Sequence, residues 1–170
     1  MSRICVCGLD DMPDMVKGMR PGRLISLLPV DQQPPTPPPL KDSDHLRVLI
    51  DDLDEPRDGF TAPGREHVEE LLLFLHASPP EIPLVIHCFA GVSRSPAAAL
   101  MALALHAPGR EREAASLLRK AAPFACPNRL LVQLADNALG RAGALVAALD
   151  SMRQPEWNFD FQPFFLPRVL

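Results

Sequence analysis

The most restrictive feature of the sequence is a short apolar strand followed by a loop of small residues and a helix with almost no polar face. Residues 84–86 (Leu-Val-Ile) form an uninterrupted apolar run, which is typical of a strand buried on both faces of a sheet. Residues 97–107 are rich in alanine and leucine, so the helix that they predict must be largely buried too. A buried strand followed by a buried helix indicates a sheet covered on both faces, the α/β class.

Hydrophobic periodicity in the rest of the chain agrees with this class. The other predicted strands are 4–8, 23–28 and 45–50. The other predicted helices are 13–19, a segment between Pro63 and Pro79, 111–121, 127–139 and 141–152. Strands alternate with helices first and helices follow at the end, so we predict a central, mainly parallel sheet of four to five strands flanked by helices.

The length of 170 residues and the apolar content of 47% suit one compact domain, which we assign to residues 1–154. Residues 30–40 contain five prolines and predict an extended connector, because proline fixes φ and lacks an amide donor. The connector could span two layers of the domain or bind an aromatic groove in a partner. Residues 155–170 form an aromatic tail that should pack on the domain or on a neighbour. Its aromatic residues are Trp157, Phe159, Phe161, Phe164 and Phe165.

Composition argues against several functions. The formal net charge is −4 and the 17 basic residues form no long run, so no nucleic-acid partner is expected. Asp10 and Asp11 interrupt the first apolar stretch before a signal core could form, and the apolar run 96–108 is too short to cross a bilayer. We therefore expect a cytoplasmic protein without a membrane partner. Neither the histidines nor the four cysteines have metal-ligand spacing, so no metal or other cofactor is expected.

The loop after the central strand carries the chemistry. Small residues at 90, 91 and 93 allow successive backbone amides to turn inward, and a helix N-terminus closes the loop, an arrangement that binds a phosphate dianion. The same field favours the thiolate of Cys88, which makes this cysteine a nucleophile and a target for reversible oxidation. Arg94, six positions later, carries a planar guanidinium that can hold two phosphate oxygens. The stretch therefore predicts phosphoryl transfer to sulfur.

The residues His87-Cys88, five further residues and Arg94 form the His-Cys-x5-Arg signature of the protein tyrosine phosphatases. The full stretch 87–96 (His-Cys-Phe-Ala-Gly-Val-Ser-Arg-Ser-Pro) resembles the dual-specificity branch and its small bacterial relatives. A second segment, 127–134, looks like the Pro-Asn-x-x-Phe-x-x-Gln-Leu segment of that branch. The resemblance covers roughly residues 45 to 140 and implies a dual-specificity-phosphatase-like fold.

The resemblance also implies roles for the residues that match. Cys88 would attack phosphorus and form a phosphocysteine, and Ser95 would donate a hydrogen bond to its sulfur. His87 would tune the thiolate through the loop backbone. Asn128 would brace the loop, although capping of the helix that follows fits an asparagine equally well. The phosphate oxygens would be bound by Arg94 and by the amides of Phe89, Ala90, Gly91, Val92, Ser93 and Arg94.

The general acid should come from the acidic loop after the third strand. In related enzymes a proline commonly follows the acid by four positions, and Asp52 has Pro56 at that spacing. Asp54 is the alternative, and Asp51 should point away from Asp52 if strand alternation continues. A further alternative is that these carboxylates only solvate a turn.

The substrate is less constrained than the reaction. The interior of the loop, residues 89–93, carries no lysine, whereas relatives that act on phosphoinositides tend to have one there. The sequence favours a phosphotyrosine, phosphoserine or phosphothreonine protein, or a small phosphate monoester, over a lipid phosphate. A phosphate-binding pseudophosphatase or interaction module is the alternative function. The sequence does not indicate an oligomeric state.

Overall fold

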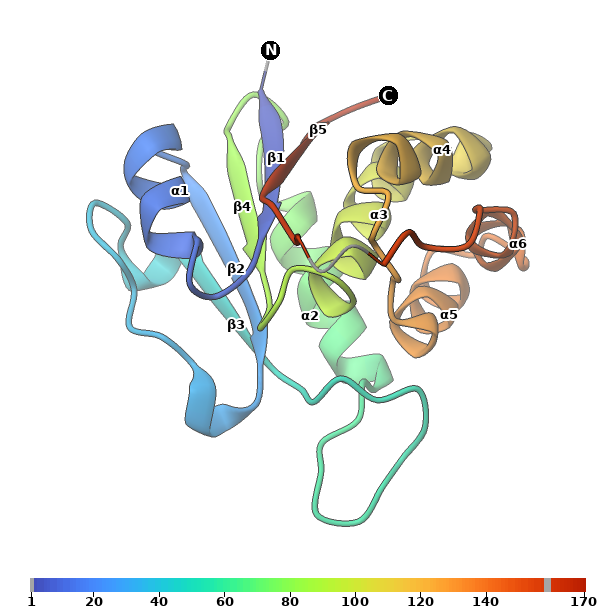
Figure 1. The fold of residues 1–170 in the computed structure, drawn as a ribbon, viewed down its shortest axis with the longest axis horizontal. Helices are drawn as coiled ribbons and strands as arrows, with labels where there is room; N and C mark the ends of the chain where they lie inside the picture. Colours follow the sequence, from blue (N-terminus) through green and yellow to red (C-terminus); the bar gives the residue numbers. More distant parts are fainter. Residues whose placement is uncertain (1, 158–159) are drawn as a thin grey trace.

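The computed structural model describes residues 2–157 and 160–170. A five-stranded sheet of order β3-β2-β4-β1-β5 forms its centre (Figure 1). The strands are β1 (Arg3–Cys7), β2 (Arg23–Leu28), β3 (His45–Leu49), β4 (Leu84–His87) and β5 (Phe164–Pro167). The first four strands pair in parallel, and β5 pairs antiparallel with β1. The prediction of a mainly parallel sheet of four to five strands is therefore confirmed, with one antiparallel edge strand.

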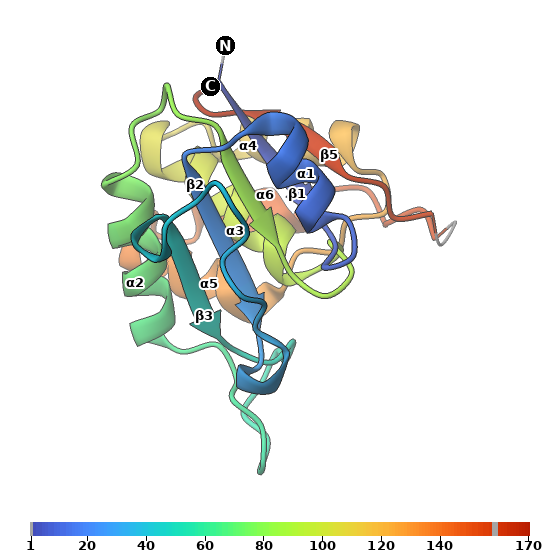
Figure 2. The same cartoon turned by 90° about the vertical axis from the view of Figure 1, so that its left-hand side faces the viewer.

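Helices cover both faces of the sheet, as Figures 1 and 2 show. The helices are α1 (Met12–Met19), α2 (Arg65–His76), α3 (Arg94–His106), α4 (Glu111–Ala121), α5 (Arg129–Ala138) and α6 (Ala144–Asp150). On one face α1 packs against β1 and β4, whereas α3 packs against β1, β2 and β4 on the other. Among residues 2–157 and 160–170, no helix has the length and apolar character needed to span a membrane.

Alternation along the strands divides the core into two parts. Leu84 and Ile86 of β4 join the larger cluster with α3, while Val85 joins a smaller cluster beneath α1. Every residue of α3 from Arg94 to Ala104 is buried, as the lack of a polar face predicts. Each fully buried leucine or isoleucine in these clusters contributes about 1.5–3 kcal/mol of transfer free energy.

The aromatic tail packs on its own domain in part. Residue pairing of β5 with β1 buries Phe164 in the core, while Phe165 points to the other side and stays 43% exposed. Trp157 is 54% exposed, so the domain leaves these two aromatic side chains partly uncovered, and their packing on a neighbour stays a prediction. The predicted Phe159 lies outside the described residues. The strand was missed because only four residues alternate, too few for a recognisable period.

The proline-rich connector lies along the strands that it joins. Its first residues, Val30–Gln32, form a short 3₁₀ turn, a departure from a fully extended connector. The amide of Gln33 then donates to the carbonyls of Leu28 (2.8 Å) and Val48 (3.1 Å), and Arg47 Nε donates to the carbonyl of Pro34 (3.2 Å). These bonds fix the connector to β2 and β3.

Candidate active site

The loop between β4 and α3 rests on the carboxyl end of β1. Gly91 has φ +74°, and a Cβ there would lie 2.8 Å from the carbonyl carbon of Cys7. The amide of Leu9 donates to the carbonyl of Phe89 at 2.9 Å, and the amide of Cys126 donates to that of Val92 at 2.8 Å. Glycine is therefore required at 91, both for its backbone conformation and for the close approach to β1.

Cys88 lies at the bottom of the loop, with 2% of its surface exposed. Its Sγ is 3.1 Å from Oγ of Ser95, which is buried in the first turn of α3. The N-terminus of this helix carries partial positive charge, which stabilises an anion held near it. The predicted nucleophile and its predicted hydroxyl partner are therefore in hydrogen-bond contact.

Arg94 is also buried, with 6% of its surface exposed. Its Nη1 donates to the carbonyl of Ile50 at 3.0 Å, which directs the guanidinium from the end of β3. Among the described residues, no carboxylate forms an ion pair with Arg94, and its Nε is buried without a hydrogen-bond partner. A buried cation without a counter-charge is costly, and an anionic ligand would compensate it.

The acidic loop meets the phosphate-binding loop through Asp52. Oδ1 of Asp52 accepts a hydrogen bond from Ser93 Oγ at 2.7 Å. By contrast, Asp54 accepts from the amide of Arg129 at 3.1 Å, at the start of α5, and Asp51 accepts from the amide of Thr61 at 2.8 Å. Among the described residues, Asp52 is the one of these three carboxylates whose side chain forms a hydrogen bond with the phosphate-binding loop.

The side chain of Asn128 forms hydrogen bonds in two directions. Its Oδ1 accepts from the amide of Leu131 at 2.9 Å and caps α5. Its Nδ2 donates to Asp52 Oδ1 and to the carbonyl of Leu53, both at 3.0 Å, and its backbone amide donates to the carbonyl of Ser93 at 3.2 Å. One side chain therefore joins the acidic loop to the start of α5.

The remaining loop residues differ in exposure. Phe89 is 63% exposed and points away from the core. Ala90, Val92 and Ser93 are half-buried, and Gly91 is buried. The aromatic ring of Phe89 is therefore largely exposed to solvent.

His87 lies directly before the nucleophile and is fully buried. Its Nδ1 is 3.4 Å from the carbonyl oxygen of Cys88, and its Nε2 is 2.5 Å from Ser26 Oγ. Burial, with a smaller effect of the Arg94 charge, lowers the pKa of His87 to about 4 although the contact with the Cys88 carbonyl acts to raise it, so the ring is neutral at pH 7. A neutral ring cannot serve as a second cation of the site.

Sequence reasoning missed Ser26 and the link from it to His45. Ser26 Oγ is 2.7 Å from His45 Nε2, and both residues are buried. The available signal was one hydroxyl within the otherwise apolar stretch Leu24–Leu28, since a buried polar group needs partners. Among the described residues, no group of three or more histidine, cysteine, aspartate or glutamate side chains could hold a metal ion.

Comparison with solved structures places this geometry in a known fold. The chain is similar to DUSP15, with a TM-score of 0.60, 23% identity and coverage of 90% of this chain and 94% of that one. It is also similar to human DUSP28, with a TM-score of 0.57, 19% identity and coverage of 83% and 94%. No protein-family model and no curated protein matches the sequence. The chain has the fold of these dual-specificity phosphatases.

Proposed function

We propose that this protein is a phosphatase that hydrolyses phosphate monoesters through a phosphocysteine intermediate. The observation that carries the proposal is the pairing of buried Cys88 with a buried Arg94 that has no carboxylate partner among the described residues. A thiol nucleophile and an uncompensated guanidinium in one loop suit an incoming phosphate dianion. The dual-specificity-phosphatase fold supports the same reaction class.

The reaction would proceed in two displacements. Cys88 Sγ attacks phosphorus while the P–O bond to the substrate breaks, and Asp52 delivers a proton to the leaving oxygen. Arg94 and the loop amides of residues 89–94 hold the three equatorial oxygens throughout. A water molecule then attacks the phosphocysteine, Asp52 accepts its proton, and the Ser95 hydroxyl donates to the departing sulfur. No metal ion takes part in these steps.

The substrate class follows from the charge of the loop. Residues 89–93 add no cationic side chain, so the site offers one guanidinium for one phosphate group. This favours a phosphotyrosine, phosphoserine or phosphothreonine protein, or a small phosphate monoester, over a polyphosphorylated lipid headgroup. The exposed ring of Phe89 suits contact with the group that carries the phosphate.

The test compares wild-type protein with Cys88→Ser on p-nitrophenyl phosphate, in the presence and absence of EDTA. We expect turnover that resists EDTA in the wild type, and none in C88S, while orthovanadate still binds C88S in part. Phosphocysteine at residue 88, trapped by acid quench and detected by mass spectrometry, would identify the intermediate. Phosphate binding without turnover in the wild type would instead favour a phosphate-binding module.

A further inference from the structure

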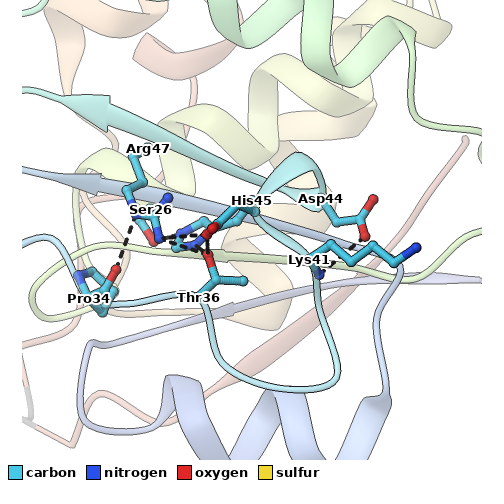
Figure 3. Close-up of polar contacts among 8 residues, drawn as sticks. Ser26, Pro34, Thr36, Lys41, Asp44, His45 and Arg47 are labelled. Carbon is cyan, nitrogen blue, oxygen red and sulfur yellow. Dashed lines mark hydrogen bonds and ion pairs between the residues drawn. The ribbon is translucent and has the colours of Figure 1, made fainter.

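A chain of hydrogen-bonding side chains, half-buried at Thr36 and buried beyond it, runs from the proline-rich connector to His87. Thr36 Oγ1 is 2.9 Å from His45 Nδ1, His45 Nε2 is 2.7 Å from Ser26 Oγ, and Ser26 Oγ is 2.5 Å from His87 Nε2. Figure 3 shows the His45 ring between Ser26 and Thr36. This set of four side chains, Thr36, His45, Ser26 and His87, is called the relay below.

The relay lies on the face of the sheet opposite to the nucleophile. Ser26 and His87 are paired in register on neighbouring strands, and their alternate neighbours Leu24 and Val85 pack beneath α1. Cys88 belongs to the cluster around α3 on the other face. The relay can therefore reach the nucleophile only through the backbone, at the contact between His87 Nδ1 and the carbonyl oxygen of Cys88.

The direction of each hydrogen bond follows from a count of hydrogens at the His87 end. A carbonyl oxygen only accepts, so Nδ1 of His87 carries the hydrogen in its contact with Cys88. The neutral ring then has a bare Nε2, to which Ser26 must donate its single hydroxyl hydrogen. Because that hydrogen is used, Ser26 can only accept from His45, whose Nε2 must carry a hydrogen.

At the connector end, two acceptors compete for the hydroxyl hydrogen of Thr36. With Nε2 protonated, neutral His45 needs a donor at Nδ1, and Thr36 is the group in contact. Thr36 Oγ1 is also 2.5 Å from Asp42 Oδ1, which only accepts, and it receives a hydrogen bond from Arg47 Nη2 at 2.7 Å. One threonine hydrogen therefore serves either His45 or Asp42.

We propose that His45 is a positioning residue for the phosphate-binding loop that contains Cys88. The Nε2–H of His45 donates to Ser26 and so turns the Ser26 hydroxyl hydrogen toward His87. This fixes His87 as the Nδ1–H tautomer, which donates to the Cys88 carbonyl. This donation polarises the peptide between Cys88 and Phe89, which strengthens the Phe89 N–H as a donor to anions in the loop. The functional consequence rests on the proposed phosphatase activity. The tautomer and the reactivity of the thiol do not depend on that activity.

The charges around His45 are consistent with the neutral ring that the count requires. Burial lowers its pKa to about 4, and the neighbouring Arg47 and His87 act in the same direction. Asp42 opposes them by raising it. Asp44, Lys41 and Arg23 are the other charged groups on the adjoining turn and strand, and Asp44 pairs with Arg23. His45 is therefore neutral at pH 7.

The experiment uses full-length protein labelled with ¹⁵N at histidine. His45→Phe keeps a planar ring but removes the donor, whereas His45→Gln returns an N–H near the position of Nε2. His76→Gln, at the exposed end of α2, is the matched control. We expect separated Nδ1 and Nε2 signals for His87 in wild type, H45Q and H76Q, and signals that converge toward the tautomer average in H45F.

Reactivity provides the second measurement. Alkylation of Cys88 by iodoacetamide at pH 6, followed by mass spectrometry, should slow about three- to tenfold in H45F and recover in H45Q. Ser26→Ala removes the middle of the relay, so adding H45F to S26A should have no further effect. If H45F does not fold, Thr36→Val removes the hydroxyl donor to His45 Nδ1 at the other side of the ring, with the same expected convergence of the His87 signals.

The proposal is overturned by either of two results. One is an unchanged His87 tautomer together with an unchanged alkylation rate in folded H45F. The other is an H45F effect that persists in full in the S26A background, which would mean that His45 acts by packing. Absence of phosphatase turnover in the wild type would refute the proposed function, while the tautomer and alkylation measurements would still decide on the relay.

Discussion

Nδ2 of Asn128 lies 3.0 Å from Oδ1 of Asp52, across 76 residues of sequence. The same carboxylate oxygen accepts from Ser93 of the catalytic loop, and the same asparagine caps α5 through Leu131. Three segments that are far apart in the chain therefore meet at one carboxylate. Their geometry determines which carboxylate of the acidic loop contacts the phosphate-binding loop.

Substitution of Asn128 should separate the two roles of its side chain. Asn128→Asp keeps an oxygen for the cap but places a second negative charge beside Asp52, whereas Asn128→Ala removes both contacts. We expect N128A to lose about 1 kcal/mol of unfolding free energy and N128D to lose less, because aspartate caps as well as asparagine. Both should lower kcat about tenfold or more, since neither holds Asp52. Equal stability losses with unchanged kcat would contradict this assignment.

The identity of the general acid is tested by Asp52→Asn against Asp54→Asn. With Asp52 as the acid, D52N should slow hydrolysis of phenyl phosphate by about 10²- to 10⁴-fold and remove the basic limb of the pH–rate profile. It should slow p-nitrophenyl phosphate far less, because that leaving group scarcely needs a proton. D54N retains an oxygen for the amide of Arg129 and should behave as wild type. The reverse pattern would assign the acid to Asp54.

Gly91→Ala should damage the catalytic loop, and Gly59→Ala is its matched control. Both glycines have positive φ, but a Cβ at 91 would meet the backbone of Cys7 and Gly8, whereas nothing lies within 4 Å of one at 59. We expect G59A to cost about 1 kcal/mol of unfolding free energy, and G91A to cost more and to weaken phosphate binding at least tenfold. Denaturant unfolding and phosphate titration measure the two effects.

Oxidation should act on Cys88 before the other thiols. The end of α3 and Arg94 place positive charge beside Cys88, whereas burial and the charge of Asp54 raise the pKa of Cys126, the only described cysteine that is exposed. Dilute peroxide should therefore inactivate the enzyme, with recovery on reduction, and Cys126→Ser should be inactivated at the same rate. Equal alkylation of all four cysteines at pH 6 would refute the preference.

Stability should depend on pH through His87. Its pKa is about 4 in the folded chain against an ordinary 6.5, so the unfolded chain binds a proton that the folded chain does not between these values. The contribution of His87 to the free energy of unfolding is therefore fully present above pH 6.5 and is lost as the pH falls toward 4. Between pH 7 and 5 this loss amounts to about 1–2 kcal/mol. In urea unfolding, His87→Gln should reduce the dependence of the free energy of unfolding on pH. Part of the dependence should remain in this variant, because the pKa of His45 is lowered too.

The sequence by itself determined the central βα unit, because its signals are local. The apolar run of β4, the loop from Cys88 to Arg94 and the all-apolar α3 are continuous in the chain, so spacing alone indicates the strand, the loop and the buried helix. Contact of Cys88 Sγ with Ser95 Oγ follows from the same continuity, since the helix begins beside the loop. The distinction between Asp52 and Asp54 had only a proline spacing to support it.

Tertiary structure alone decided the contacts that join distant segments. The edge strand β5 exists because β1 offers it a partner, and four alternating residues are too few to predict it. Asp52 meets Ser93 only because the ends of β3 and β4 lie at the same edge of the sheet. His45 reaches His87 through Ser26 because parallel register puts side chains of neighbouring strands on one face. Each of these contacts depends on through-space distance, which a linear pattern does not encode.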